Sequence, residues 1–161
     1  MEFLDTSFLE DGEIKLILER TADENPVRNW VPAYYFLICD KAGRKMGTCD
    51  LRVGYREGLY YGGHIGYAVD EPFRGRHYAA KACRLLFLLA ERHGMDHLFI
   101  TCDPDNFASR RTCEILGGEL LEIAELPEDN DMRVNDGDTH KCVYRFGLKP
   151  KTGLMNRKQT K

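Results

Sequence analysis

The sequence has 161 residues, of which 43% are hydrophobic and 30% are charged, a balance typical of one compact soluble domain. Its formal net charge of -3 argues against a basic nucleic-acid-binding face, and no apolar run approaches the roughly 20 residues that span a bilayer. The acidic start of the chain, residues 1–5, does not have the character of a secretory signal. We therefore expect a cytoplasmic protein with no nucleic-acid partner and no membrane partner.

The first part of the chain predicts a run of antiparallel strands. Residues 13–19 alternate apolar and polar side chains, as a half-buried strand does. Two further strands, at 33–39 and 45–53, flank a turn at 40–43 and form a hairpin. Residues 21–31 are polar and irregular, which suits a short helix or a substrate-side loop.

The second part alternates strands with helices. Residues 77–93 repeat apolar residues at helical spacing and are followed by Gly94, and a second helical segment is closed by Gly117 and Gly118. The expected elements are a strand at 62–69, a helix at 77–93, a strand at 97–102, a helix at 106–116, and strands at 119–125 and 141–148.

This order predicts an α+β fold in which a mixed, mainly antiparallel sheet is flanked by helices. We expect a single domain over residues 1–148. Residues 149–161 carry five basic and no acidic side chains and little apolar content, which favours a disordered basic tail.

The six cysteines are scattered and form no C-x-x-C pair, which argues against a disulfide framework or a zinc site. We expect reduced thiols that act as small core residues. His93 and His97 are four residues apart, but Gly94 interrupts the helix between them, so we expect no metal site. The cysteines are Cys39, Cys49, Cys83, Cys102, Cys113 and Cys142.

One segment predicts a binding site from its residues alone. A strand ends, and a turn at 74–79 leads directly into an amphipathic helix. Unpaired N–H groups and the positive end of the helix dipole favour an anion there, most naturally a phosphate. Gly75 and Ala79 leave room for it, and Arg74 and Arg76 add positive charge. The patterns G-x-x-x-x-G-K-[ST] and G-x-G-x-x-G are both missing from this segment, so it is not a nucleotide P-loop or a dinucleotide fingerprint.

The same segment resembles motif A of the GNAT acetyltransferase superfamily, whose pattern is Q/R-x-x-G-x-G/A. Residues 74–79 supply the arginine and the closing small residue, whereas His77 stands where the family usually has glycine. This substitution bears on how closely a pyrophosphate approaches the backbone.

A second segment, residues 106–118, is similar to motif B of that superfamily. Asn106, Ser109 and Gly117 occupy the matching positions. The two motifs together cover about residues 45–148. Residues 65–67, Ile-Gly-Tyr, indicate the Rim-like branch of the superfamily.

The resemblance implies the GNAT acyl-CoA N-acyltransferase fold and an N-acetyltransferase with acetyl-CoA as co-substrate and no metal. A primary amine of a small molecule, or a peptide or protein N-terminus, would attack the thioester directly in an opening between the fourth and fifth strands. A homodimer is compatible with the family. The residues implied in cofactor binding are Ala68, Val69, Arg74, Gly75, Arg76, His77, Tyr78, Ala79, Ala80, Asn106 and Ser109.

The catalytic acid and base are less defined. Many family members have a tyrosine seven residues after the motif B asparagine as the acid, and here that position is Cys113. The thiol could act as the acid, or the reaction could proceed without one. Asp50 and His64 are the candidate bases, with structural hydrogen bonding as the alternative for each.

Two departures from the family pattern, at His77 and Cys113, keep open a catalytically weak CoA-binding module with a regulatory or sensing role. A longer acyl donor also stays open. Acceptor specificity in the family depends on regions that correspond to residues 21–31 and 127–139. The second of these is acidic, which suits either a rim that attracts a cationic amine or an ordinary solvated loop.

Overall fold

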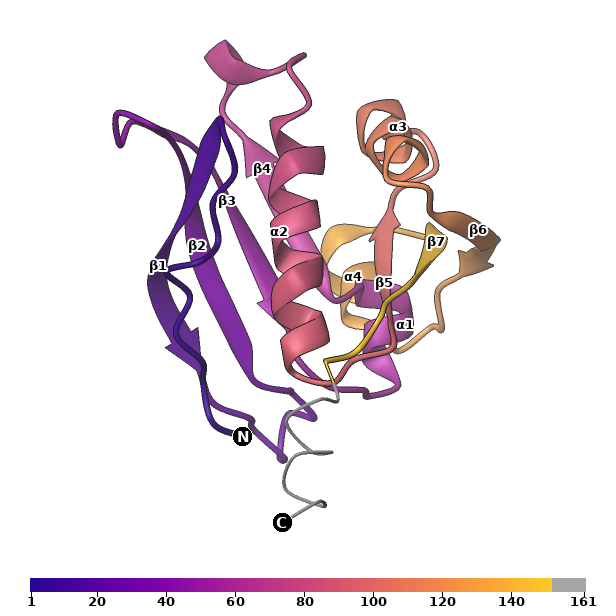
Figure 1. Ribbon diagram of the computed structural model, residues 1–161. Helices are drawn as coiled ribbons and strands as arrows, with labels where there is room; N and C mark the ends of the chain where they lie inside the picture. Colours follow the sequence, from indigo (N-terminus) through magenta and orange to yellow (C-terminus); the bar gives the residue numbers. More distant parts are fainter. Residues whose placement is uncertain (152–161) are drawn as a thin grey trace.

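A computed structural model describes residues 1–151 (Figure 1). Every strand pair is antiparallel, with β1-β2-β3-β4 forming one sheet and β5-β7-β6 a second. The strands are β1 Ile14–Ala22, β2 Ala33–Asp40, β3 Lys45–Arg52, β4 Ile65–Val69, β5 His97–Cys102, β6 Glu119–Glu125 and β7 His140–Gly147. The helices are α1 Gly58–Gly62, α2 Tyr78–Arg92, α3 Phe107–Ile115 and α4 Asp131–Asp136, with a 3-10 turn at Glu71–Phe73.

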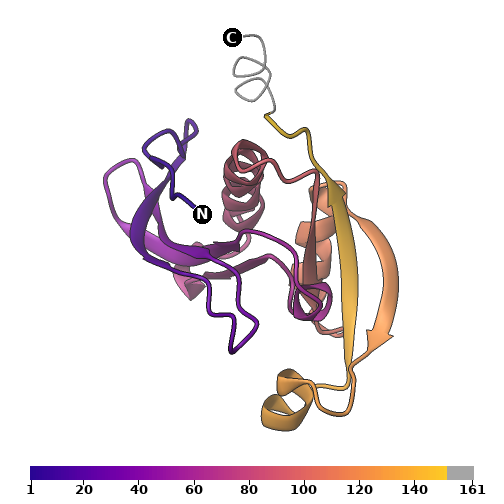
Figure 2. The ribbon, with the colours of Figure 1, turned by 90° about the horizontal axis from the view of Figure 1, so that it is seen from below.

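The predicted α+β class is confirmed, with the strands divided between two sheets. In Figure 1, α2 lies between the sheets, and seen from below the sheets diverge on either side of it (Figure 2). One hydrophobic core includes inner residues of both sheets, such as Phe36 and Ile100, and the buried face of α2, including Leu86 and Leu89. Burying each such side chain contributes about 2 kcal/mol. The core therefore fixes both sheets to one helix.

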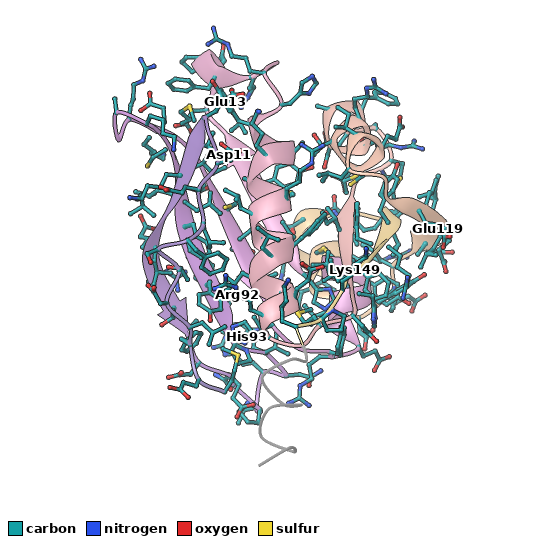
Figure 3. All side chains as sticks on the ribbon, viewed as in Figure 1. Asp11, Glu13, Arg92, His93, Glu119 and Lys149 are labelled. Atoms are coloured by element: carbon teal, nitrogen blue, oxygen red, sulfur yellow. The ribbon has the colours of Figure 1, made fainter. Side chains whose placement is uncertain are left out.

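Polar contacts fasten both ends of α2 to the first sheet, near the Glu13 and His93 labels in Figure 3. At the start of the helix, the Lys81 Nζ donates to Glu13 Oε1 at 2.9 Å. At its end, the Tyr34 hydroxyl and His93 Nε2 are hydrogen-bonded at 2.6 Å. These contacts fix both ends of α2 against the first sheet, of which β4 is an edge strand.

Two short helices were not predicted. α1 lies between the strand predicted at 45–53 and the start of the strand predicted at 62–69, and it has five residues and no side-chain cap to mark its start. α4 lies in the predicted acidic loop, where Asn130 Oδ1 accepts the N–H of Met132 as an N-cap. Residues 21–31 hold no helix. β1 extends to Ala22, and a bridge between Asn25 and Trp30 closes the loop.

The predicted reduced, buried cysteines are confirmed, because all six thiols are free and lie in the interior. Of the predicted tail, the N–H groups of Lys149 and Lys151 bond to Glu91 at the end of α2. Residues 152–161 lie outside the described residues. Within residues 1–151 no helix is long and apolar enough to cross a membrane.

Candidate functional site

His64, immediately before β4, joins the two sheets. Its N–H donates to the Phe99 carbonyl of β5 at 2.7 Å, and the Phe99 N–H donates to the imidazole Nδ1 at 3.0 Å. Because Nδ1 accepts this bond, the ring proton lies on Nε2, which donates to the Gly54 carbonyl at 2.9 Å. Beyond this joint β4 and β5 do not pair, so the sheets separate and a groove opens between them.

The groove has a volume of about 720 Å³ and brings both sequence motifs to one place. β4 and the start of α2 form one wall, and α3 and the end of β5 form the other. Nine of the eleven predicted cofactor residues line it: Ala68, Val69, Arg74, Gly75, His77, Tyr78, Ala79, Asn106 and Ser109. The other two do not line it, because Arg76 points to solvent and Ala80 is buried beneath the first turn of α2.

The backbone of β4 presents alternate residues to the groove. At its two ends, the His64 carbonyl accepts a β3 N–H at 2.7 Å, and the Asp70 N–H donates to a β3 carbonyl at 2.8 Å. Antiparallel pairing alternates, so the polar groups of Tyr67 and Val69 point away from β3 and into the groove. The N–H of Ala68, which we expected to face the ligand, points toward β3.

The turn before α2 contains two residues with left-handed backbone. Gly75 has φ +83°, and His77, the residue before the helix, has φ +62°. Glycine is the usual residue at such a left-handed position because it has no Cβ, so His77 accepts a steric cost of about 1 kcal/mol. The Arg74 Nε donates to the Val69 carbonyl at 2.9 Å, which ties the turn to the end of β4.

The first turn of α3 is fixed by its own motif residue. Asn106 Oδ1 accepts the N–H of Ser109 at 3.1 Å and thereby caps the helix. The side-chain nitrogen of Asn106 keeps its donors for the groove. Across the groove, the hydroxyls of Ser109 and Tyr67 are hydrogen-bonded at 2.6 Å.

Asp50 of β3 lies beside the groove on the face of the sheet that points away from α2. It pairs with Gly66 of β4, and a Cβ added to Gly66 would lie 2.9 Å from Asp50 Oδ2. Because Gly66 has no side chain, the Asp50 carboxylate lies against the backbone of Gly66, which lines the groove. Arg52 Nη1 donates to Asp50 Oδ1 at 2.6 Å and orients it.

The geometry does not suit His64 or Cys113 to acid–base chemistry. Burial lowers the pKa of His64 to about 4, and both of its ring nitrogens are already hydrogen-bonded to the backbone. Cys113 has no exposed surface and does not line the groove, and burial raises the pKa of its thiol to about 12. Of the three predicted catalytic residues, Asp50 alone is near the groove with an available polar atom.

Sequence reasoning missed several groove residues, chiefly Tyr67, Arg111 and Lys141. Lys141 is nearly buried, and its Nζ donates to Asp103 at 2.6 Å and Asp138 at 3.1 Å, so it links the end of β5 to the loop before β7. The motifs give no role to the side chains of Tyr67 and Arg111, and Lys141 lies outside both motifs. Helical spacing alone could have identified Arg111, since it lies about one turn beyond Ala108, which also lines the groove.

Comparison with known protein families gives a match to the acetyltransferase (GNAT) domain over residues 4–119. No curated protein matches the sequence.

Solved structures share the fold at low sequence identity. RimL, a ribosomal L7/L12 alpha-N-protein acetyltransferase in complex with coenzyme A, is 22% identical, with a TM-score of 0.57 over 76% of this chain. An acetyltransferase of Salmonella typhimurium that modifies the N-terminal serine of L7/L12 is 22% identical, with a TM-score of 0.56 over 76% of this chain. The microcin C7 self-immunity acetyltransferase MccE, in complex with acetyl-CoA and AMP, is 20% identical, with a TM-score of 0.57 over 77%. The chain spans 65%, 66% and 64% of these three structures, respectively.

Because buried His64 has a lowered pKa, the free energy of unfolding should depend on pH. The pKa of His64 is about 4 in the folded protein and 6.5 when unfolded, so the unfolded state binds more protons between these values. Stability from this group is complete above pH 6.5 and is lost as the pH falls toward 4. Between pH 7.5 and 5 we expect His64 to account for a loss of about 2 kcal/mol, measured by urea unfolding.

His64→Gln should show a flatter pH dependence than the wild type over this range. His140→Gln, at an exposed histidine, is the control and should keep the wild-type slope. Equal slopes in all three proteins would contradict the assignment.

The left-handed backbone at His77 predicts that His77→Gly is more stable than His77→Ala by about 1 kcal/mol. Alanine retains the Cβ that is strained at φ +62°, whereas glycine does not. Chemical denaturation of the two variants measures the difference, and an alanine variant at least as stable as the glycine variant would argue against the strain.

Proposed function

The chain belongs to the GNAT acetyltransferase family, and from this premise we propose that it transfers the acetyl group of acetyl-CoA to a primary amine. The observation that carries the proposal is the single groove into which both motifs project, with an anion-binding helix start at one end and a carboxylate at the other. Bound acetyl-CoA supplies an activated thioester. The protein's own residues bind it, orient it and accept the proton of the amine.

The start of α2 holds the pyrophosphate in this proposal. The first N–H groups of a helix have no intrahelical partners, and the helix dipole adds to their attraction for an anion. Gly75 has open space where a Cβ would stand, so a phosphate can approach the backbone of residues 74–80 closely. Arg76 contributes positive charge from solvent, and Arg111 contributes it from the opposite wall.

β4 holds the pantetheine chain. The N–H and carbonyl of Tyr67 and the N–H of Val69 face the groove and can pair with its amides, as an added strand would. The Val69 carbonyl already accepts a bond from Arg74. The free amide nitrogen of Asn106 can donate from the other wall, and Ser109 lies beside it. A chain held this way extends from the start of α2 toward Gly66.

Asp50 is the proposed base. An acceptor that reaches the thioester beside Gly66 lies next to the Asp50 carboxylate, which can take the ammonium proton directly or through one water. Arg52, bonded to Asp50 Oδ1 at 2.6 Å, holds this carboxylate in one orientation. Most of the rate enhancement would come from holding the amine and the thioester together.

The acceptor is proposed to be a small-molecule amine or a peptide or protein N-terminus. RimL supports the protein N-terminus and MccE supports the small molecule, and the RimL structures support the Rim-like branch. Residues 127–139, part of which Lys141 ties to β5, would contribute to acceptor selection. A catalytically weak CoA-binding module is the second candidate, because Cys113 is buried and cannot serve as the family's acid.

We also propose a cytoplasmic location and a single domain over residues 1–148. Six free, buried thiols suit a reducing compartment. A homodimer is a further proposal, supported by the edge strand β6, which exposes Leu120, Leu121 and Ile123.

Isothermal titration tests the cofactor. Acetyl-CoA and CoA should both bind the folded protein, whereas NAD should not. Release of free thiol with a panel of amines and peptides then separates the enzyme from the binding module. Binding of CoA without turnover on any acceptor would favour the module, and no binding of either CoA form would contradict the site.

Asp50→Asn should lower kcat by about 10²–10⁴-fold and leave the Kd for acetyl-CoA within about twofold, since the amide cannot accept the proton. Part of the loss should be recovered at high pH, where the amine is already deprotonated. Asp40→Asn is the matched control, because Asp40, the last residue of β2 in the same sheet, also pairs with an arginine, Arg44 of the following turn, at 2.9 Å. An equal effect of both substitutions would contradict the assigned base.

A further inference from the structure

Tyr67 is a polar side chain in the groove to which the proposed function gives only a backbone role. Its hydroxyl lies 2.6 Å from the Ser109 hydroxyl of α3, and its ring packs against the core. Both residues line the groove. The Tyr67 phenol therefore extends from β4, in one wall of the groove, to α3 in the other wall.

The alternation of side chains along β4 separates Tyr67 from the proposed base. Successive side-chain positions of a strand face opposite sides, so the Tyr67 side chain points to the side of α3, whereas a Cβ added to Gly66 would face Asp50. The anion-binding turn follows the C-terminal end of β4. A ligand extending back from Val69 therefore brings its far end toward Tyr67 and Gly66, which lie about 7 and 10 Å along the strand.

The position on α3 where the family has its acid is closed off from the groove. Cys113 lies one turn after Ser109 on the same face of the helix, and its thiol is fully buried. The Tyr67 hydroxyl, which Ser109 holds against this turn, is a hydroxyl available to the groove there.

We propose that Tyr67 donates a hydrogen bond to the sulfur of acetyl-CoA as the thiolate departs, with Ser109 as the residue that positions it. This inference rests on the proposed function. In the reaction a bond forms between the amine nitrogen and the acetyl carbon, and the carbon–sulfur bond breaks with its electron pair passing to sulfur. Asp50 takes the amine proton, and the thiolate later takes a proton from solvent.

The chemistry of the pair suits donation of a hydrogen bond and not transfer of a proton. Burial raises the pKa of Tyr67 well above its usual value, so the phenol stays protonated. When Ser109 donates to the Tyr67 oxygen, the phenolic proton is free to point at a ligand. A donor fixed before the reaction stabilises the charge that develops on sulfur.

The pKa of the thiol of enzyme-bound CoA tests this role without turnover. It is followed by the ultraviolet absorbance of the thiolate as the pH is raised, with the protein alone subtracted. A donor to sulfur favours the thiolate, so the bound thiol should titrate about one pH unit below free CoA in the wild type. In Tyr67→Phe it should return to near the value of free CoA.

The same substitution should lower kcat by about 10–100-fold while the Kd for acetyl-CoA changes less than about threefold. Tyr55→Phe is the matched control, because Tyr55 lies outside the groove, with its hydroxyl bonded to the His97 carbonyl at 2.8 Å. It should keep the wild-type thiol pKa. Ser109→Ala should give an intermediate value, and it serves as the test if Tyr67→Phe does not fold.

A bound thiol that titrates alike in the wild type and in Tyr67→Phe, or in Ser109→Ala where that variant is the test, would overturn the inference. The proposed function would stand in that case, since it requires only binding and turnover by the wild type. Failure of the wild type to bind CoA would overturn both.

Discussion

The groove depends on the fact that the two sheets are fastened at His64 and separate beyond it. The residue replaces a continued β-ladder with two bonds to Phe99, one from its backbone and one to its imidazole, and its Nε2 anchors the ring to Gly54. A buried ring with both nitrogens paired carries no unsatisfied polar atom. Because α2 packs on both sheets, the sheets cannot close again past this joint.

β4 lies at the edge of the first sheet, so only half of its backbone polar groups bond within the sheet. One set of backbone groups bonds to β3, and the other set is left for a ligand. The side chains divide in the same way, with Tyr67 on the side of α3 and Asp50 over Gly66 on the other side. One short strand therefore presents a binding edge, a hydrogen-bond donor and a neighbouring carboxylate to a ligand at one level.

The parts of this arrangement that follow local rules were predictable from the sequence. The turn at 74–79, the amphipathic helix after it and the Asn106 cap depend on neighbouring residues, and the structure has all three. The role of His64 was not predictable, because its partners Gly54 and Phe99 are 10 and 35 residues away. The usual pKa of histidine, about 6.5, made His64 a candidate base, but burial lowers its pKa to about 4 in the folded protein.

Cys113 and Tyr67 also show what the sequence could not predict, because one predicted site residue is closed off and an unpredicted one reaches the groove. Position 113 was predicted to face the cofactor because of its spacing from Asn106, but packing against the core closes it off. The residue that reaches the groove at this level comes from β4, 46 residues earlier in the chain. Which side chain reaches the groove depends on how distant segments pack together, and the spacing of residues within one segment does not predict this.

The most direct test of the account is a titration with CoA followed by the amide resonances of the ¹⁵N-labelled protein. The account predicts that the N–H signals of Tyr67, Val69 and the first turn of α2 shift most, and that the signal of Ala68, whose N–H is bonded to β3, shifts less. Saturable binding that moves none of these amides, and instead perturbs residues outside the groove between β4 and β5, would contradict it.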